Sequence, residues 1–214
     1  MKIGDRDFRS IWPSEDGVSV EIIDQTKLPH ALEIVRLSEL DDAARAIADM
    51  WVRGAPLIGA TAAYGMALAL RDDPSDAALA SAYETLHATR PTAINLRWAL
   101  DRVRHVVGRL PQQDRAAAAW RLAGEICDDD VATNRQIGEN GLALIEAIAR
   151  GKRPGEPVNV LTHCNAGWLA TVDWGTATAP IYLAHDKGIA VHVYVDETRP
   201  RNQGAGLTAY ELGN

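Results

Sequence analysis

Two short apolar runs late in the sequence constrain the fold most strongly. The first, VNVLTHC at residues 158–164, predicts a buried strand, and the second, IAVHVYVDE at residues 189–197, predicts another. Residues 167–187 between them predict a crossover that is helical over most of its length. Two strands joined in this way pair in parallel, and such crossovers are right-handed in almost all proteins. This part of the chain therefore predicts the start of a Rossmann-like parallel α/β domain.

The residues before this region predict a β element followed by a helical layer. VSVEIID at 18–24 and ALEIVRL at 31–37 alternate in strand fashion, and the TKLPH turn between them predicts an antiparallel pair. At Ser38 the period changes to that of a helix, with Ser38 expected as the N-cap. Further helices are predicted at about 56–71, 75–88, 93–109 and 113–150.

Glycine and proline in GKRPGEPVNV, residues 151–160, predict a domain boundary. We expect an N-terminal β element and helical domain over residues 1–150, and the first part of the α/β domain over residues 151–214. A parallel sheet is stable when several strands are covered on both faces, yet only two strands are predicted here. We therefore expect a truncated α/β domain, with its remainder missing from this chain or supplied by a partner chain. The isolated 214-residue chain is expected to be inactive.

Composition argues against several classes of protein. The chain is 47% hydrophobic and 24% charged, which is typical of a globular protein. Its net charge is −7 and its Lys and Arg residues are scattered, so no nucleic-acid-binding surface is predicted. The N-terminus has no apolar signal segment, and the longest uncharged run, residues 54–70, contains Pro56 and three glycines. That run predicts a buried helix and not a membrane span.

The two cysteines, Cys127 and Cys164, lie far apart without metal-ligand spacing. We predict no disulfide framework, no metal site and a reduced cytoplasmic location. Cys164 stands where a strand is expected to stop and a helix to start, which is where ligands bind in parallel α/β proteins. Its thiol could act as an acid–base group, although a free cysteine is more often an inert buried residue. His163 falls on the opposite strand face and is expected to be structural.

Two arginines stand at predicted helix boundaries. Arg53 precedes Gly54, Ala55 and a helix-starting proline, where a guanidinium and free N–H groups can hold one phosphate. Arg90 stands before a proline that keeps it extended, and it could complete a phosphate site. The alternatives are an ordinary helix entry with a surface arginine and an inter-helix loop with a solvated charge.

A further polar group follows the second apolar run. At this strand end the hydroxyl groups of a sugar could be recognised, and the alternative is a solvated charged loop. The residues that crowd the loop are Asp196, Glu197, Arg199, Arg201 and Gln203.

Four motifs together resemble one family of proteins. RGAPLIG, RPTAINLRWALDR, THCNAGWLAT with a following GTA, and DETRPRNQGAGLTAYEL occur in the order and approximate spacing of the methylthioribose-1-phosphate isomerases. That family also includes ribose-1,5-bisphosphate isomerase and the alpha, beta and delta regulatory subunits of eukaryotic initiation factor two-B. The resemblance covers nearly the whole chain, and four motifs in register are far more specific than one.

The resemblance implies which residues form the site. Cys164 matches the family's catalytic cysteine, and the matching substrate-binding positions are Arg53, Gly54, Ala55, Arg90 and Gln203. The family's catalytic aspartate lies in a later GADR-like segment that this chain does not contain. The chain also departs from the family in GTATAP at residues 175–180, where GTALG is common, and at Gly206, where an arginine often stands.

The resemblance also implies a function. It implies an intramolecular oxidoreductase, an aldose–ketose isomerase that converts 5-methylthioribose 1-phosphate to 5-methylthioribulose 1-phosphate in methionine salvage. It implies a small sugar-phosphate partner, no metal or organic cofactor, and a homodimer of complete subunits. One alternative is an isomerase of another pentose 1-phosphate, such as ribose 1,5-bisphosphate or 5-deoxyribose 1-phosphate. The other is a non-catalytic, initiation-factor-like regulatory subunit, which would not need the thiol of Cys164.

Overall fold

The computed structural model describes residues 1–214 and divides into two compact units. One unit comprises Ser10–Asp129, and the other comprises Met1–Arg9 together with Asp130–Asn214. The predicted mixed α/β class, with N-terminal strands, a helical region and parallel strands near the end, is confirmed. The units divide within helix α5 (Gln112–Ala149), and the predicted domain boundary at residue 150 stays a prediction.

The Ser10–Asp129 unit opens with a small antiparallel sheet. Its strands are β3 (Ile11–Pro13), β4 (Val20–Ile23) and β5 (Ile34–Leu37), with β4 in the middle. Val20 lies opposite Leu37, and both side chains are fully buried. The antiparallel element predicted from residues 18–37 is therefore confirmed, and β3 adds a third strand to it.

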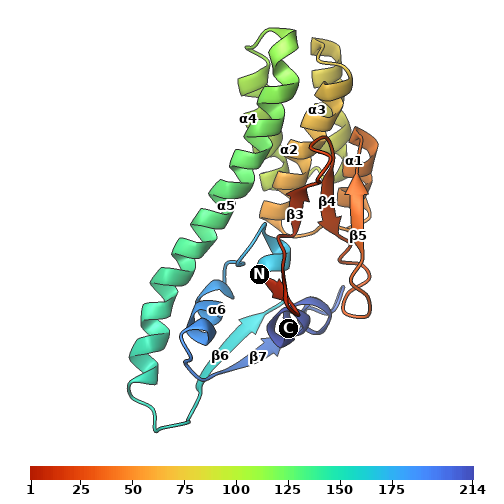
Figure 1. The fold of residues 1–214 in the computed structure, drawn as a ribbon. Helices are drawn as coiled ribbons and strands as arrows, with labels where there is room; N and C mark the ends of the chain where they lie inside the picture. Colours follow the sequence, from red (N-terminus) through yellow and green to blue (C-terminus); the bar gives the residue numbers. More distant parts are fainter. The chain divides into compact units, whose positions relative to one another are not determined.

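The helical layer of this unit is built around α2 (Ala55–Asp72). Residues 57–68 of α2 are all buried, because the helix is apolar around most of its circumference. Gly59 permits close packing, since a Cβ there would lie 3.0 Å from the backbone oxygen of Asn95. Figure 1 shows α2 together with the helices that pack against it, which are α1 (Leu40–Ala48), α3 (Asp76–Thr89) and α4 (Ile94–Val107).

The start of α1 corrects one prediction, because its N-cap is Glu39 and not Ser38. The Glu39 side chain accepts the backbone N–H of Asp42, and the Asp42 carboxylate accepts the backbone N–H of Glu39 at 3.3 Å. The same carboxylate accepts the N–H of Ser38 at 2.9 Å. This reciprocal capping satisfies more backbone donors than a single serine hydroxyl could.

The other unit contains the parallel strand pair. Strands β6 (Val158–His163) and β7 (Val191–Asp196) pair in parallel, as predicted. One face packs on α6 (Ala179–Asp186) and the last turns of α5, through a core made of Leu142, Ile145, Val158 and Ala184. The opposite face is open, with Leu161 65% and Tyr194 54% exposed. The strand predicted to be buried at residues 158–164 is buried on one side only in this chain, because successive side chains of a strand face opposite sides and only one side meets a core.

The crossover between these strands is less helical than predicted. Residues Trp168–Ala170 form one 3₁₀ turn, η1, and α6 begins only at Ala179. In the intervening loop the N–H of Val172 donates to the carboxylate of Asp130, a residue of α5, at 2.8 Å. The N–H of Gly175 donates to the Thr171 hydroxyl at 3.1 Å. Side chains therefore satisfy backbone groups that a continuous helix would pair with one another.

Short elements complete this unit. The N-terminal residues form a hairpin of β1 (Lys2–Ile3) and β2 (Arg6–Asp7), and the ammonium group of Met1 lies 2.8 Å from the Asp173 carboxylate. The last elements are a π-helical turn, η2 (Gly204–Thr208), and the short helix α7 (Ala209–Gly213). None of the helices in residues 1–214 has the length and apolar character needed to cross a membrane.

Candidate active site

Cys164 follows directly after β6 and has an uncommon backbone conformation. Its φ is 60°, in the left-handed region, which costs a non-glycine residue on the order of 1 kcal/mol or more. Two hydrogen bonds hold it there. Its N–H donates to the carbonyl of Asp196 at 3.0 Å, and its carbonyl accepts the Thr208 hydroxyl at 2.6 Å. The half-buried free thiol is therefore fixed at the carboxyl end of the strand pair.

The loop after β7 carries Gln203 and is organised by one carboxylate. Glu197 accepts the N–H groups of Thr198 at 2.7 Å, Gly204 at 2.8 Å and Ala205 at 2.9 Å. These backbone donors, Ala205 foremost, lower the pKa of Glu197. Gly204 is needed because a Cβ there would lie 2.7 Å from the Asp196 carbonyl. Hydrogen bonds to Glu197 thus hold the loop in a defined conformation, so it is more than a group of solvated charges.

Gln203 stands immediately before the π-helical turn η2. Its side-chain oxygen Oε1 is buried and has no hydrogen-bond partner within the protein. Turns of this kind occur often at functional sites, because the extra residue redirects side chains. The structure therefore brings Cys164 and Gln203 to the ends of two neighbouring strands of one unit, with an acceptor oxygen of Gln203 unused.

The remaining predicted site residues belong to the Ser10–Asp129 unit. Gly54 is the N-cap of α2 with a φ of 87°, Ala55 is the first helical residue, and Pro56 stands in the first turn as predicted. Arg53 precedes this helix start. Because Gly54 has the left-handed φ that glycine tolerates, the chain can turn sharply from Arg53 into the helix. The free N–H groups of α2 give this end a partial positive charge.

Arg90 occupies the C-cap of α3 with extended φ of −148°, as expected before a proline. Its carbonyl accepts the N–H of Ala93 at 2.9 Å in the turn that leads into α4. The first turns of α2 and α4 pack together at Gly59 and Asn95. The segments of Arg53 and Arg90 therefore lead into neighbouring helix starts of one unit.

A buried carboxyl group behind the Cys164 turn was not predicted from the sequence. Glu211 of α7 is 3% exposed and accepts hydrogen bonds from the Asn165 side-chain amide and from the Tyr182 hydroxyl, the latter at 3.2 Å. Burial raises the pKa of Glu211 to about 7, against the lowering effect of these donors. The available signal was its spacing, since Glu211 lies four residues after the apolar Leu207 and so shares its helix face.

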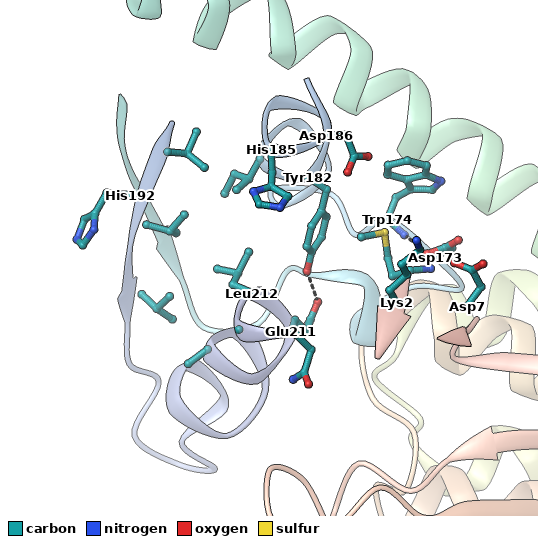
Figure 2. Close-up of a pocket in the computed structure, with 18 residues that line it drawn as sticks. Lys2, Asp7, Asp173, Trp174, Tyr182, His185, Asp186, His192, Glu211 and Leu212 are labelled. Atoms are coloured by element: carbon teal, nitrogen blue, oxygen red, sulfur yellow. Dashed lines mark hydrogen bonds and ion pairs between the residues drawn. The ribbon is translucent and has the colours of Figure 1, made fainter. Parts of the chain in front are cut away.

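Tyr182 and Glu211 line a hollow of about 840 Å³ in the same unit. Figure 2 shows Tyr182 of α6 and Glu211 of α7 pointing toward each other, while His192 of β7 points away on the other side of the strand. Burial and the Glu211 carboxylate raise the pKa of Tyr182, so its hydroxyl stays protonated and remains a donor. No group of three or more His, Cys, Asp or Glu side chains in residues 1–214 could hold a metal ion.

Comparison with known proteins finds relatives that are named as isomerases and as initiation-factor subunits. A model of the Initiation factor 2 subunit family matches residues 51–214. The methylthioribose-1-phosphate isomerase of Methylocella silvestris is 65% identical over 213 residues, which cover 100% of this chain and 58% of that protein. The protein of the same name from Sinorhizobium medicae is 63% identical, over 99% of this chain and 58% of its own length. The chain thus spans less than two thirds of the length of these relatives.

Two solved structures have a similar fold. The 5-methylthioribose 1-phosphate isomerase of Pyrococcus horikoshii matches 97% of this chain and 58% of its own, with a TM-score of 0.84 and 36% identity. The delta subunit of translation initiation factor eIF-2B from A. fulgidus matches 97% of this chain and 59% of its own, with a TM-score of 0.82 and 37% identity. The fold is therefore shared by an isomerase and by an initiation factor.

Proposed function

The chain belongs to the initiation factor 2 subunit family, and from this premise we propose that it acts as an aldose–ketose isomerase on 5-methylthioribose 1-phosphate. The product is 5-methylthioribulose 1-phosphate, an intermediate of methionine salvage. The observation that carries the proposal is Cys164, whose backbone is held at a strand end by hydrogen bonds to the Asp196 carbonyl and from the Thr208 hydroxyl. Relatives named for this activity are 63–65% identical to the chain. A regulatory subunit would have no need of the thiol.

The chemistry follows from the phosphate on the anomeric oxygen. That phosphate blocks spontaneous opening of the furanose ring, so an acid must protonate the ring oxygen. Hydrogen then moves from C2 to C1, either as a proton through an enediol or as a hydride, and no external oxidant or reductant is consumed. We assign one acid–base role to Cys164. The aspartate that the family resemblance implies as its partner has no counterpart assigned among residues 1–214.

The other site residues bind the substrate in this proposal. Arg53 and Arg90 hold the phosphate, and the start of α2 at Gly54 and Ala55 adds N–H donors and the positive end of the helix dipole. Gln203 offers its unpartnered oxygen to a sugar hydroxyl. Holding phosphate and hydroxyl groups fixes C1 and C2 relative to the acid–base groups, which lowers the entropy cost of the transfer. A homodimer and a cytoplasmic location remain predictions.

A regulatory subunit is the second candidate, favoured by the match to the eIF-2B delta subunit at a TM-score of 0.82. Such a protein would bind a nucleotide or a sugar phosphate without turnover. The third candidate is an isomerase of ribose 1,5-bisphosphate or 5-deoxyribose 1-phosphate. All three candidates would bind an anion at such a site, so anion binding does not distinguish them. Turnover and substrate preference do.

A turnover assay separates these candidates. The chain as its gene encodes it is incubated with 5-methylthioribose 1-phosphate, ribose 1,5-bisphosphate or 5-deoxyribose 1-phosphate, and the ketose product is followed by NMR. We expect the highest kcat/KM for the first sugar. Binding without turnover of any sugar would favour the regulatory subunit, and a preference for either other sugar would favour the third candidate.

A further inference from the structure

Glu211 is a carboxyl group buried behind the turn that carries Cys164. Four donors converge on it: the Asn165 side-chain amide, the Tyr182 hydroxyl, and the backbone N–H groups of Trp168 and Leu169. All four donors are uncharged. The carboxylate is therefore held by hydrogen bonds alone, and these contribute most when the acceptor is ionised.

A chain of hydrogen bonds connects this carboxylate to Cys164. The Asn165 amide donates one N–H to Glu211 and another to the Thr208 hydroxyl oxygen at 3.1 Å. The Thr208 hydroxyl donates its own hydrogen to the carbonyl of Cys164 at 2.6 Å. Every hydrogen in this chain therefore has a fixed direction. Glu211 has to accept on both oxygens for the arrangement to hold.

Close packing fixes the other side of the turn. Gly167 lies so close to Glu211 that a Cβ on Gly167 would overlap the carboxylate oxygen Oε2. Asn165, which links Glu211 to Thr208, is itself only 6% exposed. The turn from Cys164 to Gly167 thus rests directly on the Glu211 carboxylate, with no room for a water molecule at Gly167.

We propose that Glu211 is a positioning residue for the thiol of Cys164, acting through Asn165 and Thr208 to hold the left-handed turn at the end of β6. The proposal rests on the proposed function only in that it assigns Cys164 to the reaction. A protonated Glu211 carries an O–H that only the Tyr182 hydroxyl, among its four donors, could turn to accept, so the hydrogen-bond arrangement would have to change. The ionised form holds the turn in this hydrogen-bonded geometry, and loss of the carboxyl group removes that restraint. Protonation removes the same restraint on the turn, while the neutral acid costs less to bury than the carboxylate, so the turn loosens although the folded chain as a whole gains stability.

Other ionisable groups surround Glu211 and must be separated from it. Tyr182 contacts it directly, and Cys164 ends the hydrogen-bond chain. The hollow beside it is also lined by ionisable groups from the hairpin, the crossover loop and α6, namely Lys2, Asp7, Asp173, His185 and Asp186, whereas the ring of His192 on β7 points away from it. Variants at Glu211 and at its donor Tyr182 distinguish the titration of Glu211 from that of these groups.

The test measures the thiol itself and needs no sugar phosphate. The rate of alkylation of Cys164 by iodoacetamide is measured from pH 5 to pH 9 in a Cys127→Ser background, with the chain as its gene encodes it. We expect an inflection near pH 7 in addition to the titration of the thiol, because the pKa of Glu211 is about 7. Glu211→Gln removes that inflection. Tyr182→Phe removes one donor from the ionised form and moves the inflection to higher pH.

Glu146→Gln is the matched control, because it removes a partly exposed carboxylate that is paired with Lys187 in the same unit. This variant leaves the thiol profile unchanged. If Glu211→Gln is folded and its profile superposes on that of the parent, the carboxyl group only fills space and the proposal is wrong. If Glu211→Gln does not fold, Tyr182→Phe decides, since an unmoved inflection in that variant overturns the proposal equally.

Steady-state kinetics provide the second readout. Glu211→Gln is expected to lower kcat by about 10²-fold, the scale of a small misplacement of a reacting group, with KM within a factor of about three. A raised KM with unchanged kcat would contradict positioning. If no sugar phosphate is turned over at all while the alkylation profiles behave as expected, the proposed function fails and the role of Glu211 stands.

Discussion

Helix α2 in the Ser10–Asp129 unit and the strand pair β6–β7 in the other unit are held by different forces. α2 is buried around most of its circumference, and its residues 57–68 contact other apolar side chains or close-packed backbone. The strand pair is covered on one face only, and Leu161 and Tyr194 remain mostly exposed on the other. The carboxyl end of the strand pair is fixed by hydrogen bonds among Cys164, Asn165, Thr208 and Glu211.

The two cysteines illustrate what this difference teaches. Cys127 is 3% exposed within helix α5 and is a buried cysteine outside any disulfide, the ordinary situation for this residue. Cys164 is half-buried in a left-handed turn that polar side chains enforce. Apolar packing therefore stabilises one unit, and directional polar contacts in the other define the backbone geometry at Cys164, the cysteine proposed to react.

The largest expected effect comes from exchanging the two cysteines for serine. Cys164→Ser should lower kcat by about 10² to 10⁴-fold, as for loss of an acid–base group, without changing the far-UV circular dichroism. Cys127→Ser should leave kcat within about threefold and lower only the melting temperature. Steady-state kinetics on both variants test this contrast. Near-parental activity of Cys164→Ser would show that the two cysteines do not differ in their effect on kcat.

Two glycine variants sharpen the comparison in terms of stability. Gly167→Ala should lower the free energy of unfolding by about 3 kcal/mol or more, because its Cβ would overlap the Glu211 carboxylate. Gly124→Ala in α5 should raise it by about 0.5–1 kcal/mol, since the added Cβ meets only the Tyr64 hydroxyl at 3.8 Å. Denaturant unfolding of both variants gives the two values. Equal losses of unfolding free energy in the two variants would mean that the two units tolerate an added methyl group at these glycines equally well.

The stability of the chain should depend on pH through Glu211. Its pKa rises from the ordinary value of 4.5 to about 7 on folding, so the folded form binds the proton more tightly between these values. Glu211 therefore contributes its full stabilisation to the free energy of unfolding below pH 4.5, and this contribution is lost as the pH rises to 7. At 1.36 kcal/mol per pH unit, the loss is about 3 kcal/mol. The difference in unfolding free energy between the parent and Glu211→Gln should show this slope. A flat difference from pH 4.5 to pH 8 would contradict it.

A smaller effect is expected at the phosphate site. Arg53→Ala or Arg90→Ala should raise KM by about 10- to 100-fold, the range expected for a lost hydrogen bond to a charged group. Inorganic phosphate should inhibit the parent competitively and inhibit both variants less. Unchanged KM and unchanged phosphate inhibition in both variants would place the anion elsewhere. Cys164 alkylation serves as the control, since neither arginine is expected to alter it.

Periodicity predicted most of the fold because it reports which faces are buried. The helix expected at 56–71 is α2 at Ala55–Asp72, and that expected at 113–150 is α5 at Gln112–Ala149. The crossover was harder to predict, because the side chains of Asp130 and Thr171 replace helical hydrogen bonds there. Such substitution depends on residues brought together by folding, and no local pattern contains it.

The site was predictable to the extent that it lies in short motifs. Cys164 and Gln203 stand next to predicted strand ends, and the structure places both at such ends. Glu211 was missed because Asn165 lies 46 residues away from it and Tyr182 lies 29 residues away. A charged residue on an apolar helix face was the single local indication. The roles of Arg53, Gly54, Ala55 and Arg90 in binding remain predictions.

The direction of the hydrogen bonds between Glu211 and Cys164 has a consequence for proton movement. A proton wire needs each group to pass one hydrogen forward and receive another behind it, ending at the group that reacts. Here the Thr208 hydroxyl points at the carbonyl of Cys164 and not at its sulfur, and the Asn165 amide cannot exchange roles as donor and acceptor on one atom. Glu211 is therefore insulated from the thiol as a proton reservoir, and the thiol has to gain and lose its proton through solvent or through the bound sugar.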